Sequence, residues 1–208
     1  MPRLMDIGLD QLNSMLLDMA SLSQSAVAAS IDAYTHAVTP TDVRKMADRL
    51  QTLHRQVSDL AMEVIARYQP VATDLRFIKA CMEISYGFFR YGRYALDIAQ
   101  VMEIFGDLGR CDRSPVVETA KLTEDMIRMS ADAFARRDVN LARRIPDMDD
   151  AVDERYRNNL RKVMESKSNP RCNLANVLIM RYLERISDHA AYIAESVDYI
   201  VTGVEPPD

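Results

Sequence analysis

The sequence predicts an all-α fold made of two tandem, pseudo-symmetric three-helix bundles with six long helices. Three observations support this prediction: turn-forming residues are scarce, apolar residues recur at intervals of three and four, and the two halves of the chain resemble each other. The 208 residues include only 6 Gly and 8 Pro. Few turns in a chain of this length indicate long elements, and none of them approaches the run of about 18 apolar residues that a membrane span needs.

The first half of the chain divides into three helices. Apolar spacing and the intervening breaks place them at about 6–36, from the break at 39–41 to near Tyr68, and from an N-cap at Thr73 or Asp74 to about Phe105. Thr39-Pro40-Thr41 ends the first helix and offers an N-cap to the second. Gln69-Pro70 ends the second, because proline has no N–H and pushes the residue before it out of the helical region.

The second half repeats this plan after a linker. Gly106–Pro115 combines two glycines, four charged residues and a proline. The expected helices then run from this linker to about Arg137, from Asp138 to about Met164, and from about Asn173 to Val201. Asp138 is expected to cap the middle helix of this half, which the pattern predicts as one continuous element.

An alignment of the chain with itself supports an internal duplication. Residues 74–100 match residues 169–195 at a constant offset of 95 without a gap. Charged positions coincide as well as apolar ones: Arg76 with Arg171, and Arg90 with Arg185. Unrelated amphipathic helices share apolar positions by chance but not these arginines as well, so we assign residues 1–107 and 108–208 to two copies of one unit.

A continuous apolar seam follows the third helix of each half. Its residues step by threes and fours: Ile84, Gly87, Tyr91, Ala95, Ile98, Met102 and Phe105 in the first half, and Ile179, Tyr182, Ile186, Ala190, Ile193, Val197 and Ile200 in the second. Gly87, Ala95 and Ala190 are small enough to let a neighbouring helix approach closely. We expect each seam to face the core of its own bundle.

Composition argues against several classes of protein. A net charge of −5 argues against binding nucleic acid, which needs a basic face. No stretch near the N-terminus is apolar enough for a signal peptide, so a cytoplasmic location is expected. Cys81, Cys111 and Cys172 form no CxxC pair and no zinc pattern, and they are expected to be buried or idle thiols.

Four acidic residues form two pairs at helical spacing in the second half. Glu184 and Asp188 lie one turn apart on a face away from the apolar seam. Asp149 and Asp153 form a second pair on the preceding helix. If the two helices pack antiparallel, the four carboxylates converge at a shallow surface site, where a metal cation would relieve their repulsion. Such pairs are also common on solvated acidic faces, and the spacing alone leaves both interpretations open.

Three segments of the chain resemble the PhoU family, the phosphate-uptake regulators of bacteria and archaea. They are Tyr182-Leu-Glu-Arg-Ile-Ser-Asp-His-Ala-Ala-Tyr-Ile-Ala-Glu195, Arg67-Tyr-Gln-Pro-Val-Ala-Thr-Asp-Leu-Arg76, and Asp149-x-x-Val152-Asp153. The resemblance extends over essentially the whole chain in order. It implies a PhoU-like fold of two three-helix bundles. It also implies that the four acids, Asp149, Asp153, Glu184 and Asp188, can bind a multinuclear iron or zinc cluster at the protein surface.

The same resemblance implies a regulatory function rather than an enzymatic one. A PhoU-like protein is expected to act in the cytoplasm as a negative regulator of phosphate uptake. The implied partners are the ATPase subunit of the phosphate ABC transporter and, where present, a phosphate-sensing histidine kinase. A homodimer is expected on the same grounds, with the membrane reached only indirectly through the transporter. No catalytic residue is expected, since the sequence contains no phosphate-binding loop and no nucleophile elbow.

The first half departs from the family pattern at the positions that would bind metal. Phe89 and Arg93 stand where the second half has Glu184 and Asp188. Arginine stays protonated and cannot bind a metal, so the first-half site is expected to be lost. Tyr86, Phe89 and Arg93 at helical spacing form a face of the kind that docks proteins. Packing of Phe89 against a neighbouring helix explains the same residues equally well.

Two further hypotheses compete with the metal-binding regulator. The first is a helical adaptor that binds no metal. The second is a metal-dependent hydrolase, for which the sequence offers no identifiable general base or oxyanion donor. Arg76 and Arg171 are expected to pair with acids within each bundle rather than to bind phosphate. His189 directly follows Asp188 and is turned about 100° from it, so it is not expected to be a ligand.

Overall fold

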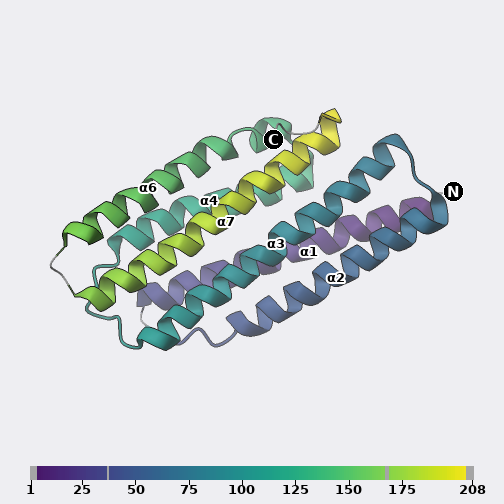
Figure 1. The fold of residues 1–208 in the computed structure, drawn as a ribbon. Coiled ribbons are helices and arrows are strands. Elements are labelled where there is room, and N and C mark those ends of the chain that lie inside the picture. The colour runs from purple at the N-terminus through teal and green to yellow at the C-terminus, as the bar shows by residue number, and fades with distance from the viewer. Residues whose placement is uncertain (1–3, 37, 167–168, 205–208) are drawn as a thin grey trace.

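The computed structural model describes residues 4–36, 38–166 and 169–204, which form seven α-helices and no strand (Figure 1). The helices are α1 Leu4–His36, α2 Val43–Tyr68, α3 Ala72–Phe105, α4 Ser114–Arg136, α5 Val139–Ala142, α6 Ile145–Glu165 and α7 Pro170–Thr202. The predicted all-α fold with six long helices is confirmed, and α5 adds a single turn. Within these ranges, no helix is long and apolar enough to cross a membrane.

The six long helices form two three-helix bundles that lie side by side in an elongated molecule (Figure 1). α1, α2 and α3 pack on one another in the first bundle, and α4, α6 and α7 do so in the second. The bundles meet mainly along α3 and α7, which run antiparallel, and α1 also contacts α4. The predicted boundary between the two repeats, with residues 1–107 in one and 108–208 in the other, stays a prediction.

α3 and α7 approach each other closely because α3 carries a glycine at their contact. A Cβ atom on Gly87 would lie 2.7 Å from both Cγ1 and Cδ1 of Ile193. Small residues in the seam therefore admit a neighbouring helix at this point, as predicted. The prediction that each seam faces the core of its own bundle is incomplete, because Gly87 and Ile193 belong to the seams of different halves and meet each other.

Arg76 and Arg171 occupy equivalent places at the two ends of this contact. A Cβ atom on Gly203 would lie 3.3 Å from Nε of Arg76, and one on Gly106 would lie 3.1 Å from Nη2 of Arg171. Gly106 and Gly203 follow the last residues of α3 and α7. Each arginine thus starts one helix and lies against the end of the other, where the partial negative charge of the carbonyl groups favours a cation. The predicted pairing with acids is not found among the described residues, where no ion pair includes either arginine.

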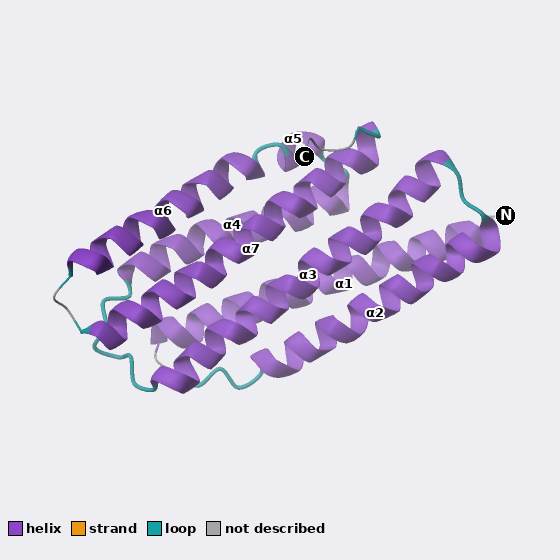
Figure 2. Cartoon of the chain, in the orientation of Figure 1, coloured by secondary structure: helices purple, strands orange, loops and turns teal. Residues whose placement is uncertain are grey.

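The middle helix of the second bundle is broken, contrary to the prediction of one continuous element (Figure 2). Residues 143–144 separate α5 from α6, which has Pro146 in its first turn. In an uninterrupted helix, Pro146 could not donate to the carbonyl of Ala142 and its ring would clash with that group. Asp138 caps α5 as predicted, since its Oδ1 accepts a hydrogen bond of 3.0 Å from the N–H of Leu141.

The predictions for the other helix ends are confirmed only in part. α2 ends at Gln69, which adopts a φ of 47° immediately before Pro70, as predicted. The predicted caps at Thr41 and at Thr73 or Asp74 are wrong, because α2 and α3 begin without a side-chain cap.

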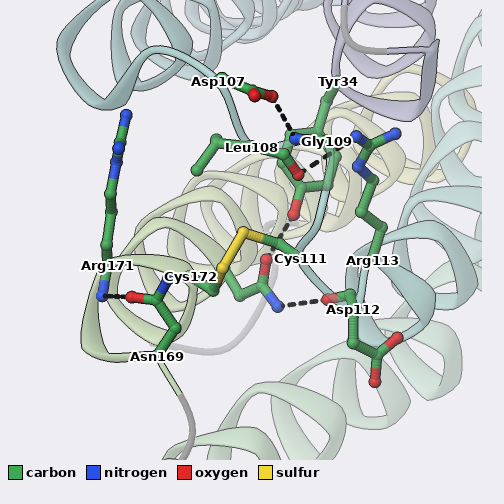
Figure 3. The surroundings of a disulfide bond; sticks show 11 residues. Tyr34, Asp107, Leu108, Gly109, Cys111, Asp112, Arg113, Asn169, Arg171 and Cys172 are labelled. Carbon is green, nitrogen blue, oxygen red and sulfur yellow. Dashed lines mark hydrogen bonds between the residues drawn. A yellow bond between two sulfur atoms is a disulfide. The ribbon is translucent and has the colours of Figure 1, made fainter.

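Cys111 and Cys172 form a disulfide bond at one end of the second bundle (Figure 3). The two Cα atoms are 5.4 Å apart although 61 positions separate the residues in sequence. The bond links the segment between the two bundles to the first turn of α7. The prediction of idle thiols is therefore wrong for this pair, because the two residues become neighbours only when α7 packs beside that segment. Cys81 is a buried free thiol, as predicted.

Candidate metal centre

Three of the four predicted metal-binding acids converge between α6 and α7. One carboxylate oxygen from each of Asp153, Glu184 and Asp188 lies within 4.8 Å of the other two. Asp153 belongs to α6, and the other two lie one turn apart on α7, which runs antiparallel to α6 (Figure 1). The antiparallel packing assumed from the sequence therefore brings these three side chains together.

Asp149 lies one turn before Asp153 on α6, beside this group rather than within it. Burial raises the pKa of its carboxyl, and the negative charges of Asp188 and Asp153 raise it further. Its Oδ1 atom is buried and has no hydrogen-bond partner among the described residues. Asp149 is therefore close enough to interact with the other acids, and its carboxylate has an unused oxygen.

Glu184 is more enclosed than the sequence predicted. The residue is only 8% exposed, so the predicted shallow surface site is wrong at this position. Burial and the neighbouring Asp188 carboxylate raise the pKa of Glu184. Its Oε2 atom is buried without a hydrogen-bond partner in the described part of the chain. Arg185 Nε is its ion-pair partner at 3.8 Å. A buried carboxylate oxygen without a hydrogen bond is costly, and a cation between α6 and α7 would give it a closer partner.

Each of the three converging acids has an arginine partner on its own helix. The pairs are Arg157 with Asp153 at 2.5 Å, Arg185 with Asp188 at 3.1 Å, and Arg181 with Glu184. The arginine side chains are partly exposed, so they can leave these contacts at small cost. A metal ion would have to compete with them for the carboxylates.

The donor atoms of this site fit a metal cation that binds oxygen. All four side chains offer carboxylate oxygens, which are ligands of hard and borderline cations. Two of those oxygens, Glu184 Oε2 and Asp149 Oδ1, are buried and accept no hydrogen bond from the residues described. Asp149, Asp153, Glu184 and Asp188 are therefore the residues that would hold a metal.

His189 is oriented away from these acids and packs between the two bundles. Its ring centroid lies 5.6 Å from that of Tyr86 and 5.9 Å from that of Tyr94, both on α3. Burial, with the charges of Arg90 and Arg185, lowers the pKa of His189 to about 4. The imidazole is therefore neutral near pH 7 and acts as a packing group at the contact between bundles.

The corresponding positions of α3 are used for packing and ion pairing. Phe89 stacks on His54 of α2, with ring centroids 5.4 Å apart and planes at 9°. Arg93 forms an ion pair of 3.1 Å with Asp97. Tyr86 is 41% exposed and tilts against His54. The interpretation that Phe89 packs against a neighbouring helix is thus confirmed, which leaves less of this face open for docking.

Comparison with known proteins accounts for both bundles at once. A model of the PhoU domain matches the chain twice, at residues 16–102 and 116–197. The chain belongs to the PhoU family. The first PhoU match runs from within α1 to near the end of α3, and the second runs from the start of α4 to within α7.

Curated PhoU proteins match most of the chain. The phosphate-specific transport system accessory protein PhoU homolog of Pseudomonas aeruginosa is 30% identical over 205 residues, which cover 95% of this chain and 85% of that protein. PhoU homolog 1 of Methanothermobacter thermautotrophicus is 33% identical over 78% of this chain and 75% of its own length. By their names, these relatives are accessory proteins of a phosphate-specific transport system.

Solved PhoU structures share the two-bundle fold. The crystal structure of PhoU from Pseudomonas aeruginosa matches with a TM-score of 0.89 at 30% identity, covering 96% of this chain and 99% of that one. The phosphate transport system regulatory protein PhoU from Streptococcus pneumoniae matches with a TM-score of 0.77 at 20% identity, which supports the fold alone. PhoU is a family of regulatory accessory proteins.

Proposed function

We propose that this protein regulates phosphate uptake as an accessory protein of a phosphate-specific transport system. The observation that carries the proposal is the match to a PhoU accessory protein over 95% of the chain. Regulation of this kind needs no catalytic group. It needs a rigid helical surface whose binding to a partner changes with a signal, and two packed helical bundles provide such a surface.

The proposal includes particular partners and an assembly. The partners are the ATPase subunit of the phosphate ABC transporter and, in cells that have one, a phosphate-sensing histidine kinase, with negative regulation of uptake as the result. We further propose a cytoplasmic homodimer that reaches the membrane only through the transporter. The net charge of −5 is compatible with a basic docking surface on a partner.

Co-purification from cells grown with high and low phosphate tests this role. The tagged chain is expected to retain the transporter ATPase, with more ATPase bound at high phosphate than at low phosphate. Deleting the gene for this protein is expected to raise phosphate uptake at high phosphate. Absence of the ATPase under both conditions, together with unchanged uptake in the deletion strain, would refute the proposal.

The acids between α6 and α7 are proposed to bind iron or zinc, as a multinuclear cluster confined to the second bundle. The buried oxygens of Glu184 and Asp149 that accept no hydrogen bond from the described residues support this assignment. Elemental analysis of protein purified without chelator is the direct test. Glu184→Ala and Asp188→Ala are expected to lose metal, whereas Asp150→Ala removes an exposed acid of α6 and is expected to keep it. Equal metal content in all four proteins would show that the site is assigned wrongly.

A metal-free helical adaptor is the second candidate. The arginine partners of Asp153, Glu184 and Asp188 favour it, because they offset part of the negative charge without a metal. Wild-type protein that contains no iron or zinc after growth with both metals, yet still binds the ATPase, would establish this alternative.

A further inference from the structure

The disulfide bond fastens the chain connection between the two bundles to the start of α7 (Figure 3). Residues 106–113 form this connecting segment between α3 and α4, and Cys111 lies within it. Its partner Cys172 lies in the first turn of α7. The bond therefore attaches the piece of chain that leads from one bundle to the other to a helix that packs against both bundles.

Hydrogen bonds hold the connecting segment at two further points. Asn176 of α7 donates a hydrogen bond of 2.8 Å from Nδ2 to the carbonyl of Asp112, and its Oδ1 accepts one from the hydroxyl of Tyr34 in α1. Arg113 Nη1 donates one of 2.6 Å to a main-chain carbonyl near the end of α1. Once the disulfide bond is reduced, these hydrogen bonds and the buried side chain of Leu108 are what hold the segment in place.

The connecting segment has little packing of its own. Leu108 is its single buried residue, and five of its eight residues are exposed. Segments with few buried apolar contacts open locally at a low cost in free energy. The covalent attachment at Cys111 therefore matters more to this segment than it would to a well-packed helix.

The same segment forms part of the walls of two cavities. Residues 106–108 line a cavity of about 510 Å³ together with Tyr34 and Met102. Residues 110–112 line a cavity of about 360 Å³ together with Cys172. A change in the position of the segment would therefore reshape both cavities.

The disulfide pair lies at the surface, in contrast to the third cysteine. Cys111 and Cys172 are both partly exposed, and both line the cavity of about 360 Å³. Cys81 is 0% exposed. Thiol–disulfide exchange requires that an attacking thiolate reach one of the two sulfur atoms. The pair is therefore placed for exchange in the folded protein, whereas Cys81 is not.

The chemistry of the cytoplasm gives a reason for the bond to be reversible. Disulfides persist in oxidising compartments, whereas in the cytoplasm they are usually transient and serve redox sensing or catalysis. The positions of the pair and of the segment are independent of the cytoplasmic location proposed above, on which only this reason for reversibility rests.

We propose that Cys111 and Cys172 form a redox switch, which fastens the connecting segment to α7 when oxidised and releases it when reduced. The reductant is a protein dithiol. One of its thiolates attacks a sulfur atom of the pair to form a mixed disulfide, and its second thiol then displaces that sulfur. The dithiol leaves as a disulfide, and its two electrons and two protons convert Cys111 and Cys172 into thiols. A disulfide oxidant reverses the reaction.

Reduction of the folded, full-length chain by thioredoxin, with its reductase and NADPH, tests the switch. Alkylation followed by mass spectrometry is expected to find free thiols at Cys111 and Cys172, while Cys81 stays unmodified. Trypsin is expected to cut after Arg110 of the connecting segment about tenfold faster or more in the reduced protein, because local opening exposes this site. Cleavage after Arg136, an exposed residue at the end of α4, is the internal control and is expected to keep its rate.

Variants and reoxidation complete the test. Cys111→Ser and Cys172→Ser are each expected to be cut after Arg110 at the fast rate with or without reductant. Cys81→Ala is expected to respond as wild type does. Oxidised glutathione is expected to return reduced wild-type protein to slow cleavage. Circular dichroism establishes that each sample is folded, and the wild-type comparison stays valid if a variant does not fold.

Three results would overturn the switch. A bond that thioredoxin reduces only after urea unfolds the chain would have a purely structural role. Reduction without faster cleavage after Arg110 would show that the segment is not released. Equal acceleration after Arg110 and Arg136 would show a general loss of stability instead of a local release. The experiment uses neither phosphate nor a transporter, so its failure would leave the proposed role in phosphate uptake unaffected.

Discussion

The two bundles share one helical plan but use equivalent positions for different chemistry. α7 directs Glu184 and Asp188 toward Asp153 of α6, where carboxylates crowd together. At the matching positions of α3, Phe89 stacks on a neighbouring ring and Arg93 pairs with an aspartate. The second bundle therefore has converging carboxylates, each with an arginine partner, where the first has ring stacking and one ion pair. Side chains on this face can change their chemistry without altering the backbone that carries them.

The features that the bundles share lie where α3 and α7 meet. Arg76 and Arg171 each lie against the end of the opposite helix. Gly87 of α3 accommodates Ile193 of α7 at the same contact, although the position matching Gly87 in α7 is Tyr182. These positions are constrained by close packing between the bundles. Four experiments test how far the two bundles differ.

Reducing the disulfide bond is expected to have the largest effect, and only the second bundle can show it. The sequence match puts Phe77 where the second half has Cys172, so the first bundle has no counterpart. Opening a covalent loop of 61 residues in the unfolded chain lowers the free energy of unfolding by roughly 4 kcal/mol. Urea unfolding with and without dithiothreitol measures it. Cys111→Ser should already be destabilised and should not respond to the reductant, and a wild-type midpoint indifferent to reductant would contradict the prediction.

Acid should weaken the contact between the bundles through His189. Its pKa is about 4 in the folded protein against 6.5 for a free histidine, so the unfolded chain binds this proton first as pH falls. The contribution of neutral His189 to the free energy of unfolding is fully present above pH 6.5. It is lost progressively toward pH 4, which lowers the free energy of unfolding by roughly 2 to 3 kcal/mol. Urea unfolding across this pH range should show that His189→Phe loses this part of the pH dependence. His36→Phe, at an exposed position, should retain it, and identical pH profiles for wild type and His189→Phe would count against the prediction.

Placing acids in the first bundle should not recreate a metal site. Phe89→Glu with Arg93→Asp restores the carboxylate spacing of α7 on α3, but the ring then leaves its stack on His54. We expect the free energy of unfolding of the double variant to be lower by roughly 2 kcal/mol, and we expect the variant to bind no metal in the first bundle. Elemental analysis and urea unfolding test both parts. Stoichiometric metal uptake would show that α2 can supply the missing ligands and that the two bundles differ less than we infer.

Removing one arginine from each bundle should give the smallest change in stability. Arg93→Ala and Arg185→Ala each break a partly exposed ion pair, and each should change the free energy of unfolding by no more than about 0.5 kcal/mol. The two substitutions should differ in their effect on metal affinity, because only Arg185 competes with the metal for an acid of the candidate centre. Metal titration is expected to show tighter binding for Arg185→Ala and no change for Arg93→Ala. Equal affinities in both variants would remove Arg185 from this role.

Much of the candidate centre could be predicted because helical spacing is a local property. Residues four apart share a face, so the acid pairs on α6 and α7 were visible before their packing was known. The burial of Glu184 was not visible, since it depends on which side chains of α6 lie across from it. Pro146 could have revealed the break after α5, because its effect on the carbonyl four residues earlier is also local.

The helical class, the duplication, the PhoU family and the loss of acids at Phe89 and Arg93 could all be predicted from the amino-acid sequence. These features follow from residue types and from a period of about 3.6 residues, which a chain shows without folding. The Cys111–Cys172 bond, the arginines at the opposite helix ends and the neutral His189 between the bundles became visible only in the folded structure. These features join residues far apart in sequence, so they exist only once the helices have packed at a particular angle and register.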